Sequence, residues 1–237
     1  MQLAALCLCA TVPVYAGPPY VTDDPEPTDL GRYEIYAFAD GSTGREGSDG
    51  AAGIDFNYGA APDLQLTAVL PFAWNAPDDG NSQTDLGNAE LAAKYRFLHQ
   101  ENVGVDVAFF PRVFLPAGAG AVGSRHTSVL LPIWLGRVGA TWSTFGGGGC
   151  VVDRGARDYC VWGWAATWQA LENLQIGTEI YHQTADDRGG RSSTNVGFGA
   201  TYDLGEHLHV MASAGPTVEN SASTNDANWY LALLLTL

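Results

Sequence analysis

Apolar and polar residues alternate with a period of two along most of the chain. The stretch LQLTAVLPFAW places the apolar side chains from Leu64 to Trp74 on one face and Gln65 and Thr67 on the other. A period of two is the repeat of a β-strand, because successive side chains of a strand point to opposite sides. No comparable helical stripe occurs in the sequence, so the pattern predicts an all-β protein.

Twelve segments carry this alternation, and several are near the length of about ten residues that a tilted strand needs to cross a bilayer. Short connections, such as a turn over residues 99–102 and a break near Gly136 and Arg137, alternate with longer polar loops, such as residues 41–50. Outer-membrane barrels have this layout. The predicted strands cover residues 32–41, 51–60, 64–75, 86–98, 103–115, 127–136, 138–146, 160–171, 174–183, 194–203, 207–216 and 228–237.

The expected fold is a closed antiparallel transmembrane β-barrel of about 12 strands, with long extracellular loops and short periplasmic turns. The last predicted strand, NWYLALLLTL, is apolar on alternate positions and would be an exposed edge in an open sheet. In a closed barrel it pairs with the first strand, and lipid covers its outward face. A soluble secreted barrel or sandwich has the same alternation, since parity alone does not tell which face is inside.

The first residues indicate export and favour the membrane barrel. They hold a short uncharged apolar run, and Val14 and Ala16 have the spacing of a signal-peptidase site. We expect a signal peptide over residues 1–16, an N-terminal arm over residues 17–30 and the barrel over residues 31–237. The expected location is the outer membrane of a Gram-negative bacterium, and the expected partners are its lipid, lipopolysaccharide and, through the C-terminal strand, the barrel-assembly machinery.

The N-terminal arm is rich in proline and acidic residues. Proline lacks the N–H that a sheet requires, so we expect an extended periplasmic arm rather than a strand. Two alternatives stay open. The arm is either a plug that folds into the lumen and pairs with Arg32, Arg96 or Arg112, or a disordered leader.

The polar face of the predicted strands carries charges of both signs, which need partners or water inside a barrel. This face is interpreted as a lumen wall that selects solutes by charge, with a closed plug of ion pairs as the alternative. The candidate lumen-lining residues are Arg32, Glu34, Asp40, Asp55, Glu90, Lys94, Arg96, Asp106, Arg112, Glu179, Asp203, His207 and His209.

Composition narrows the possible functions. The formal net charge is -15, with only 11 Lys and Arg, which argues against nucleic-acid binding. A rim-located enzyme would have to use His182 with Asp186 and Asp187, but no nucleophile motif accompanies them. We expect no enzyme, no cofactor and no metal site, although the acidic outer loops are candidates for divalent cations that bridge lipopolysaccharide phosphates.

Two cysteines lie in the predicted mature chain. Cys150 and Cys160 flank a predicted outer loop, and an exported chain passes through an oxidising compartment, so we expect a disulfide, with two free thiols as the alternative. The glycine run Gly146–Gly149 just before Cys150 lacks the following Lys of a phosphate loop. It is expected to be a flexible strand end or a place where backbones approach closely.

Several segments resemble those of a known family. They are GPPYVTDDPEPTDLGRYEIY, FGGGGC followed by WGWAATWQ, the stretch from IGTEIYHQ to GPTVEN, and WYLALLLTL. The family consists of uncharacterised bacterial outer-membrane β-barrel proteins proposed as transporters, and it is loosely related to the barrel proteins of phenol-degradation (meta-pathway) gene clusters. The resemblance implies a barrel of about twelve strands and uptake of small molecules, hydrophobic or aromatic ones among them. It implies no catalytic residues, and a structural or adhesive barrel with a blocked lumen stays an alternative.

Overall fold

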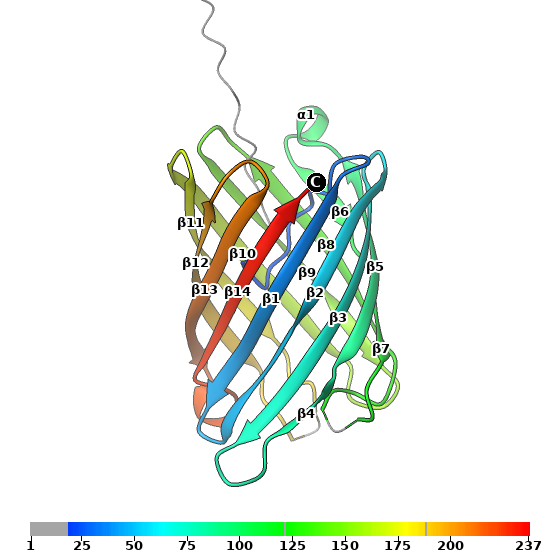
Figure 1. The fold of residues 1–237 in the computed structure, drawn as a ribbon, viewed down its shortest axis with the longest axis vertical. Coiled ribbons are helices and arrows are strands. Elements are labelled where there is room, and N and C mark those ends of the chain that lie inside the picture. Colours follow the sequence, from blue (N-terminus) through cyan, green and yellow to red (C-terminus); the bar gives the residue numbers. More distant parts are fainter. Residues whose placement is uncertain (1–18, 121, 188) are drawn as a thin grey trace, which may run out of the picture.

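The strands of the computed structural model form one closed antiparallel barrel (Figure 1). The structure describes residues 19–120, 122–187 and 189–237, so the signal peptide expected over residues 1–16 lies outside the described residues. The strands are β1 (Tyr33–Gly44), β2 (Gly47–Ala61), β3 (Leu64–Pro77), β4 (Gln83–Leu86), β5 (Asn88–Leu98), β6 (Asp106–Phe109), β7 (Arg112–Pro116), β8 (Ser128–Val138), β9 (Trp142–Asp153), β10 (Tyr159–Leu171), β11 (Leu174–Gln183), β12 (Ser193–Asp203), β13 (Leu208–Glu219) and β14 (Ala227–Thr236).

Two of the crossing strands are interrupted. β4 and β5 both pair with β3 and are separated at Gly87, and β6 and β7 both pair with β5 and β8 and are separated at Phe110 and Pro111. A proline has no N–H for the sheet, which is consistent with the second break. The predicted strands 86–98 and 103–115 are therefore each divided, and the described residues form the predicted twelve crossings of a barrel.

The two faces of the strands have the expected character. In β3, Leu66 and Leu70 are about half exposed on the outer surface, whereas Gln65 and Thr67 are buried toward the lumen. Because lipid rather than water surrounds the outer face of such a barrel, the exposed leucines are in an apolar environment. The exposed apolar surface and the buried polar wall distinguish the protein from the soluble barrel, in which the order is reversed.

The connections differ from the sequence expectation in three places. The expected long loop over residues 41–50 is absent, because β1 and β2 extend to a tight turn at Arg45 and Glu46. The expected turn over residues 99–102 is a short helix, α1 (Gln100–Val103), and the break expected near Gly136 lies at residues 139–141. α1 lies at the same end of the barrel as the C-terminus (Figure 1). No helix among the described residues is long and apolar enough to cross a membrane.

The barrel closes through its first and last strands. β1 and β14 are antiparallel, with Glu34 opposite Thr236, and the backbone groups of Tyr33 and Leu237 exchange two hydrogen bonds of 2.9 Å. This pairing satisfies the backbone hydrogen-bonding groups at the edge of the last strand. Leu231, Leu233 and Leu235 point outward and face the bilayer. The sequence expectation for the C-terminal strand is confirmed.

The predicted disulfide is present. Cys150 and Cys160 lie opposite each other on β9 and β10 and are joined by an S–S bond of 2.03 Å. The glycine run is not a strand end, as one alternative had it, because it lies inside β9. A Cβ atom at Gly149 would lie 2.3 Å from the backbone carbonyl oxygen of Leu131, which confirms the alternative of a close backbone approach.

Candidate functional site: a lumen occupied by the N-terminal arm

Residues 19–30, hereafter the arm, run inside the barrel. They form the dark blue segment between the walls in Figure 1. Thr22, Asp24 and Thr28 are at most 5% exposed, which is unusual for a segment without secondary structure. The arm is therefore a lumen insert, as the plug alternative expected, rather than a disordered leader.

The strongest charged contact of the arm is with a lysine that projects from β5. The Lys94 ammonium lies 2.9 Å from a carboxylate oxygen of Asp23 and 3.7 Å from one of Asp24, and it donates to the backbone carbonyl of Glu26. It also lies 4.9 Å from the ring centroid of Phe110. The side chain of Lys94 is only 5% exposed, so this ion pair is screened little by water.

The cations expected to hold the arm have other contacts, and that part of the plug hypothesis is wrong. Arg96 binds Asp63, with Asp106 nearby, Arg112 binds Glu90, and Arg32 is exposed. The reason is geometric, because Arg96 and Arg112 each have a carboxylate on the barrel within reach, and the Arg32 side chain faces solvent. Among the cations discussed, Lys94 has its closest carboxylate partners on the arm.

Backbone groups of the arm are satisfied by polar side chains of the wall. Glu179 accepts hydrogen bonds from the backbone N–H groups of Val21 and Thr22 at 3.2 and 2.8 Å. Gln65 accepts from Thr28 at 2.8 Å, and Ser213 donates to the carbonyl of Pro19. A proline-rich segment has few N–H groups, and these contacts pair several of those that remain.

Wall glycines leave room for the arm. A Cβ atom at Gly163 would lie 2.0 Å from the hydroxyl oxygen of Thr22, and one at Gly59 would lie 1.9 Å from the carbonyl oxygen of Asp29. A Cβ atom at Gly199 would lie 2.9 Å from the ring of Tyr20. Real side chains do not approach so closely, so the arm can lie in this position only because these wall residues are glycines. We call the three positions the glycine seats. These residues were missed in the sequence, because glycines in a strand pattern signal close approach without naming the partner.

Among the groups of the arm, the Asp24 carboxyl has a pKa that depends strongly on its position in the lumen. Burial raises the pKa of Asp24 well above its ordinary value of 3.8, and the nearby Lys94 ammonium offsets this only in part. An arm that leaves the lumen would return Asp24 to water. Docking of the arm is therefore coupled to uptake of a proton.

Beyond the arm, a second ion pair spans neighbouring strands, between a half-buried arginine and a buried glutamate. The Arg112 guanidinium donates to both carboxylate oxygens of Glu90, at 2.7 and 2.8 Å, and stacks between the rings of Phe110 and Phe114 at 5.4 and 5.7 Å. A bidentate pair of this kind fixes both side chains in place. Asp55 also faces the lumen, where it accepts a hydrogen bond from Asn57.

The remaining candidate residues, except Asp40, lie nearer the end of the barrel with the short turns. His209 is buried with Nδ1 2.7 Å from an Asp203 carboxylate oxygen, and Glu34 accepts from the hydroxyl of Tyr36. Asp40 lies in the outer half of β1, whereas Arg32 and His207 are exposed. The structure thus groups Glu90 with Arg112, Arg96 with Asp106, and Asp203 with His209, and it leaves Arg32 and His207 outside these groups. A role of this set in a solute path stays a prediction.

A polar network behind the arm was not part of the candidate set. The amide of Gln65 donates to Asn57 and Thr67 at 2.7 and 2.9 Å, and Thr67 donates to Asn57. All three side chains are buried. Their position on the polar face of the alternation was visible in the sequence, but uncharged side chains gave no reason to select them.

The histidine considered for a rim-located enzyme has different neighbours from those expected. His182 Nδ1 lies 2.8 Å from the hydroxyl of Thr194 and 3.4 Å from a carboxylate oxygen of Glu219, rather than beside Asp186 and Asp187. The Thr194 hydroxyl itself donates to Glu219. Because its proton is directed to the carboxylate, the geometry does not prepare this hydroxyl for attack with histidine as the base.

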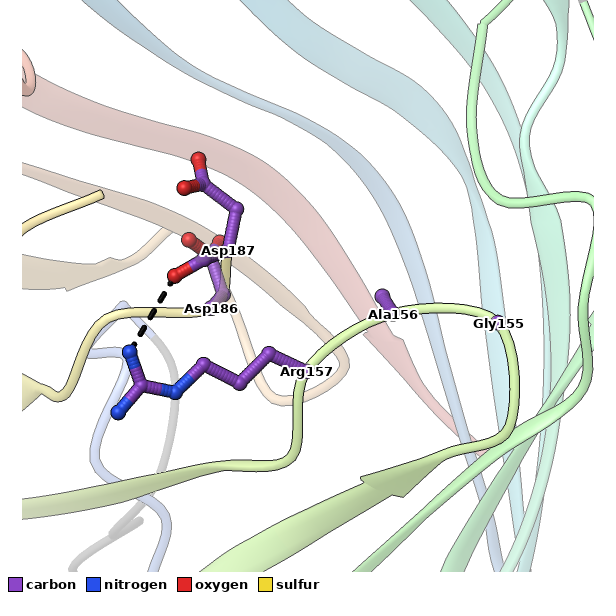
Figure 2. Close-up of a pocket in the computed structure, with 5 residues that line it drawn as sticks. All are labelled: Gly155, Ala156, Arg157, Asp186 and Asp187. Atoms are coloured by element: carbon purple, nitrogen blue, oxygen red, sulfur yellow. Dashed lines mark hydrogen bonds between the residues drawn. The ribbon is translucent and has the colours of Figure 1, made fainter. Parts of the chain in front are cut away.

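The outer loops enclose a shallow hollow of about 390 Å³. Figure 2 shows Arg157 reaching toward the loop that holds Asp186 and Asp187, and its guanidinium donates to the carbonyl oxygen of Asp187 at 3.3 Å. The Asp187 carboxylate accepts from the backbone N–H groups that follow it, at Gly189 and Gly190. No group of three metal-ligating side chains gathers within the described ranges, so the loops carry no argument for a cation site.

Taken together, the lipid-facing apolar wall, the closed sheet and the polar lumen define a bacterial outer-membrane β-barrel with a segment of its own chain inside. The chain belongs to the family described as "Putative MetA-pathway of phenol degradation", whose model matches residues 19–230. The resemblance seen in the sequence is confirmed. No curated protein matches the chain in sequence.

Three of the solved structures that match the chain show the similarity of fold. The COG4313 outer membrane channel from Pseudomonas putida F1 has a TM-score of 0.73 and 13% identity, over 90% of this chain and 98% of that chain. The KdgM porin in complex with disordered oligogalacturonate has a TM-score of 0.56 and 9% identity, over 86% and 96%. The Ralstonia pickettii toluene transporter TbuX has a TM-score of 0.51 and 9% identity, over 88% and 90%.

Proposed function

We propose that the protein is a passive outer-membrane channel for small molecules, hydrophobic or aromatic ones among them, whose arm narrows the lumen. The observation that carries the proposal is the way in which the arm is held. Its described contacts are an ion pair with one lysine, hydrogen bonds to polar side chains, glycine seats and the packing of Tyr20 on Phe145 and Ala165, with no covalent link across the lumen. Contacts of this kind break without disrupting the sheet, so the arm can leave without unfolding the wall.

The similar proteins support this function by their own descriptions. One is called an outer membrane channel, one a porin and one a toluene transporter, and the matching family is named for phenol degradation. These names suggest small aromatic compounds as the solute class here. The function proposed is transport and not catalysis, and no cofactor enters it.

Charge on the inward face gives the proposed channel a preference among ions. Carboxylates outnumber the cations Lys94, Arg96 and Arg112 on the arm and the wall, and an acidic lining lowers the energy of cations relative to anions. The acidic side chains are Asp23, Asp24, Glu34, Asp40, Asp55, Glu90 and Glu179.

The test is single-channel recording of the refolded chain 17–237 in a planar bilayer, beside a chain that lacks residues 17–29. We expect low conductance from the first, several-fold higher conductance from the second, and cation selectivity from both as read from reversal potentials. Silence of both chains, with heat-modifiable folding confirmed on gels, would contradict the channel. It would favour the rival function, a structural or adhesive barrel with a blocked lumen, which the buried arm also suits.

The raised pKa of Asp24 predicts that the arm docks more tightly at low pH. The contribution of this carboxyl to docking is fully present below its free value of 3.8, and it is lost as the pH rises through the higher docked value. We therefore expect open probability to increase with pH over that window. Asp24→Asn should flatten the dependence, because the amide does not titrate and Asp23 still pairs with Lys94. An unchanged pH profile in Asp24→Asn would contradict the assignment.

A further inference from the structure

The outer surface of the barrel carries two pairs of tryptophans that are arranged differently. Trp74 and Trp229 stack with ring centroids 6.2 Å apart, over the glycine pair Gly41 and Gly50. Trp162 and Trp164, on β10, contact opposite neighbours, His182 on β11 and Thr144 on β9. The first pair therefore stacks ring on ring, whereas a groove lies between the second pair.

The groove has identifiable walls. The ring of Trp162 stacks on His182 of β11, with centroids 4.0 Å apart, whereas the indole of Trp164 donates a 2.7 Å hydrogen bond to Thr144 of β9. The space between them is about 370 Å³, with Gly163 at its floor and Ile180 and Thr194 beside it. We call this space the outer groove.

The polarity of the outer groove changes along the membrane normal. Trp164 lies opposite Ile180, and one step toward the long loops Trp162 lies opposite His182, which in turn lies opposite Thr194 on β12. Thr194 and Ser192 both donate to the Glu219 carboxylate, which is 42% exposed. The inner end of the groove is therefore apolar, and its loop-side end presents a histidine, hydroxyls and a carboxylate.

We propose that the outer groove binds one acyl chain of an outer-leaflet glycolipid. The chain would lie between Trp164 and Ile180, and sugar hydroxyls would meet His182 and Glu219. The apolar-to-polar order matches the order of chain and headgroup in the leaflet that surrounds this end of the barrel. This site faces the bilayer rather than the lumen, so the inference does not depend on channel activity.

The polar end selects among headgroups. Glu219 and Thr194 offer acceptors to hydroxyl donors, whereas a headgroup without donors leaves the carboxylate without a new partner. Lipids of equal chain length should therefore bind in the order of their donor content. Phosphatidylcholine has no hydroxyl or ammonium donor and provides the reference.

The experiment is native mass spectrometry of the refolded full mature chain in detergent, titrated with lipid A, phosphatidylethanolamine or phosphatidylcholine. We expect one retained lipid A and little retained phosphatidylcholine. Ile180→Phe fills the groove, and we expect it to weaken lipid A retention by at least about tenfold, the loss that excluding about two chain methylenes produces. The matched control is Leu70→Phe, because Leu70 and Ile180 are 53% and 52% exposed on the outer surface.

The outcomes separate clearly. Equal retention in Ile180→Phe and Leu70→Phe would overturn the site and indicate non-specific lipid around the barrel. Retention of phosphatidylethanolamine as tight as that of lipid A, with the same loss in Ile180→Phe, would overturn the glycolipid assignment in favour of a phospholipid. Thr194→Val should weaken lipid A binding and leave the weak phosphatidylcholine binding unchanged, and loss of both would contradict the role given to the polar end.

Discussion

Lys94→Met should open the lumen to nearly the conductance of the chain without residues 17–29. The substitution keeps the length of the side chain but removes the cation that lies 2.9 Å from the Asp23 carboxylate, a side chain that is 17% exposed. Breaking one side of a buried ion pair costs about 3–5 kcal/mol, since the partner charge stays buried without compensation. The arm can avoid this cost by leaving the lumen, which favours release by roughly two to three orders of magnitude.

Single-channel recording measures this result directly. Lys94→Arg is the matched control, because it keeps the positive charge near both carboxylates and should stay at low conductance. Arg32→Met is a second control, because the Arg32 side chain is exposed and the hydrogen bond from its backbone N–H to the Asp29 carbonyl is kept in the variant. If Lys94→Met kept the low conductance of the parent chain, the ion pair would not be what holds the arm.

Gly163→Val should displace the arm by a steric route that leaves every charge in place. The Cβ atom at this position would lie 2.0 Å from the hydroxyl oxygen of Thr22, and valine adds two further methyl groups. Valine favours strands, so β10 itself should tolerate the change. The overpacking would destabilise the contact between the arm and the wall by about 1–3 kcal/mol.

The expected measurement is a several-fold rise in conductance, with heat-modifiable folding preserved on gels. Gly205→Val is the control, because nothing lies within 4 Å of a Cβ atom in that turn. A refolded Gly163→Val barrel with parental conductance would mean that the arm can shift within the lumen and still close it.

The two variants should differ in selectivity even where their conductances agree. Lys94→Met removes a positive charge from the wall, whereas Gly163→Val keeps it. The first should therefore be the more cation-selective of the two, as measured by reversal potentials in a salt gradient. This difference distinguishes loss of the arm from a change in the wall.

The alternation of side chains predicted the strands and their two faces, because burial in this fold depends on strand parity, whereas the first residues, the last strand and the two kinds of connection favoured the membrane barrel over a soluble one. The polar face that holds Gln65, Lys94 and Glu179 is the buried face, and the leucines of the last strand are the lipid-facing ones. The disulfide followed from two cysteines in an exported chain. The ends of the strands did not follow from the alternation, because the tight turn at Arg45 and Glu46 and the helix α1 depend on pairing with neighbouring strands.

What the sequence determined by itself was the class of fold, the number of crossings and the polar character of the inward face, because each depends on a period of two that one chain segment carries alone. Only the tertiary structure decided which charges meet. Lys94 rather than Arg32, Arg96 or Arg112 holds the arm, because barrel register brings Asp63 and Glu90 to two of the arginines first. The glycine seats and the groove beside Trp164 are likewise properties of adjacent strands, and a contact between residues far apart in sequence leaves no mark in the local pattern.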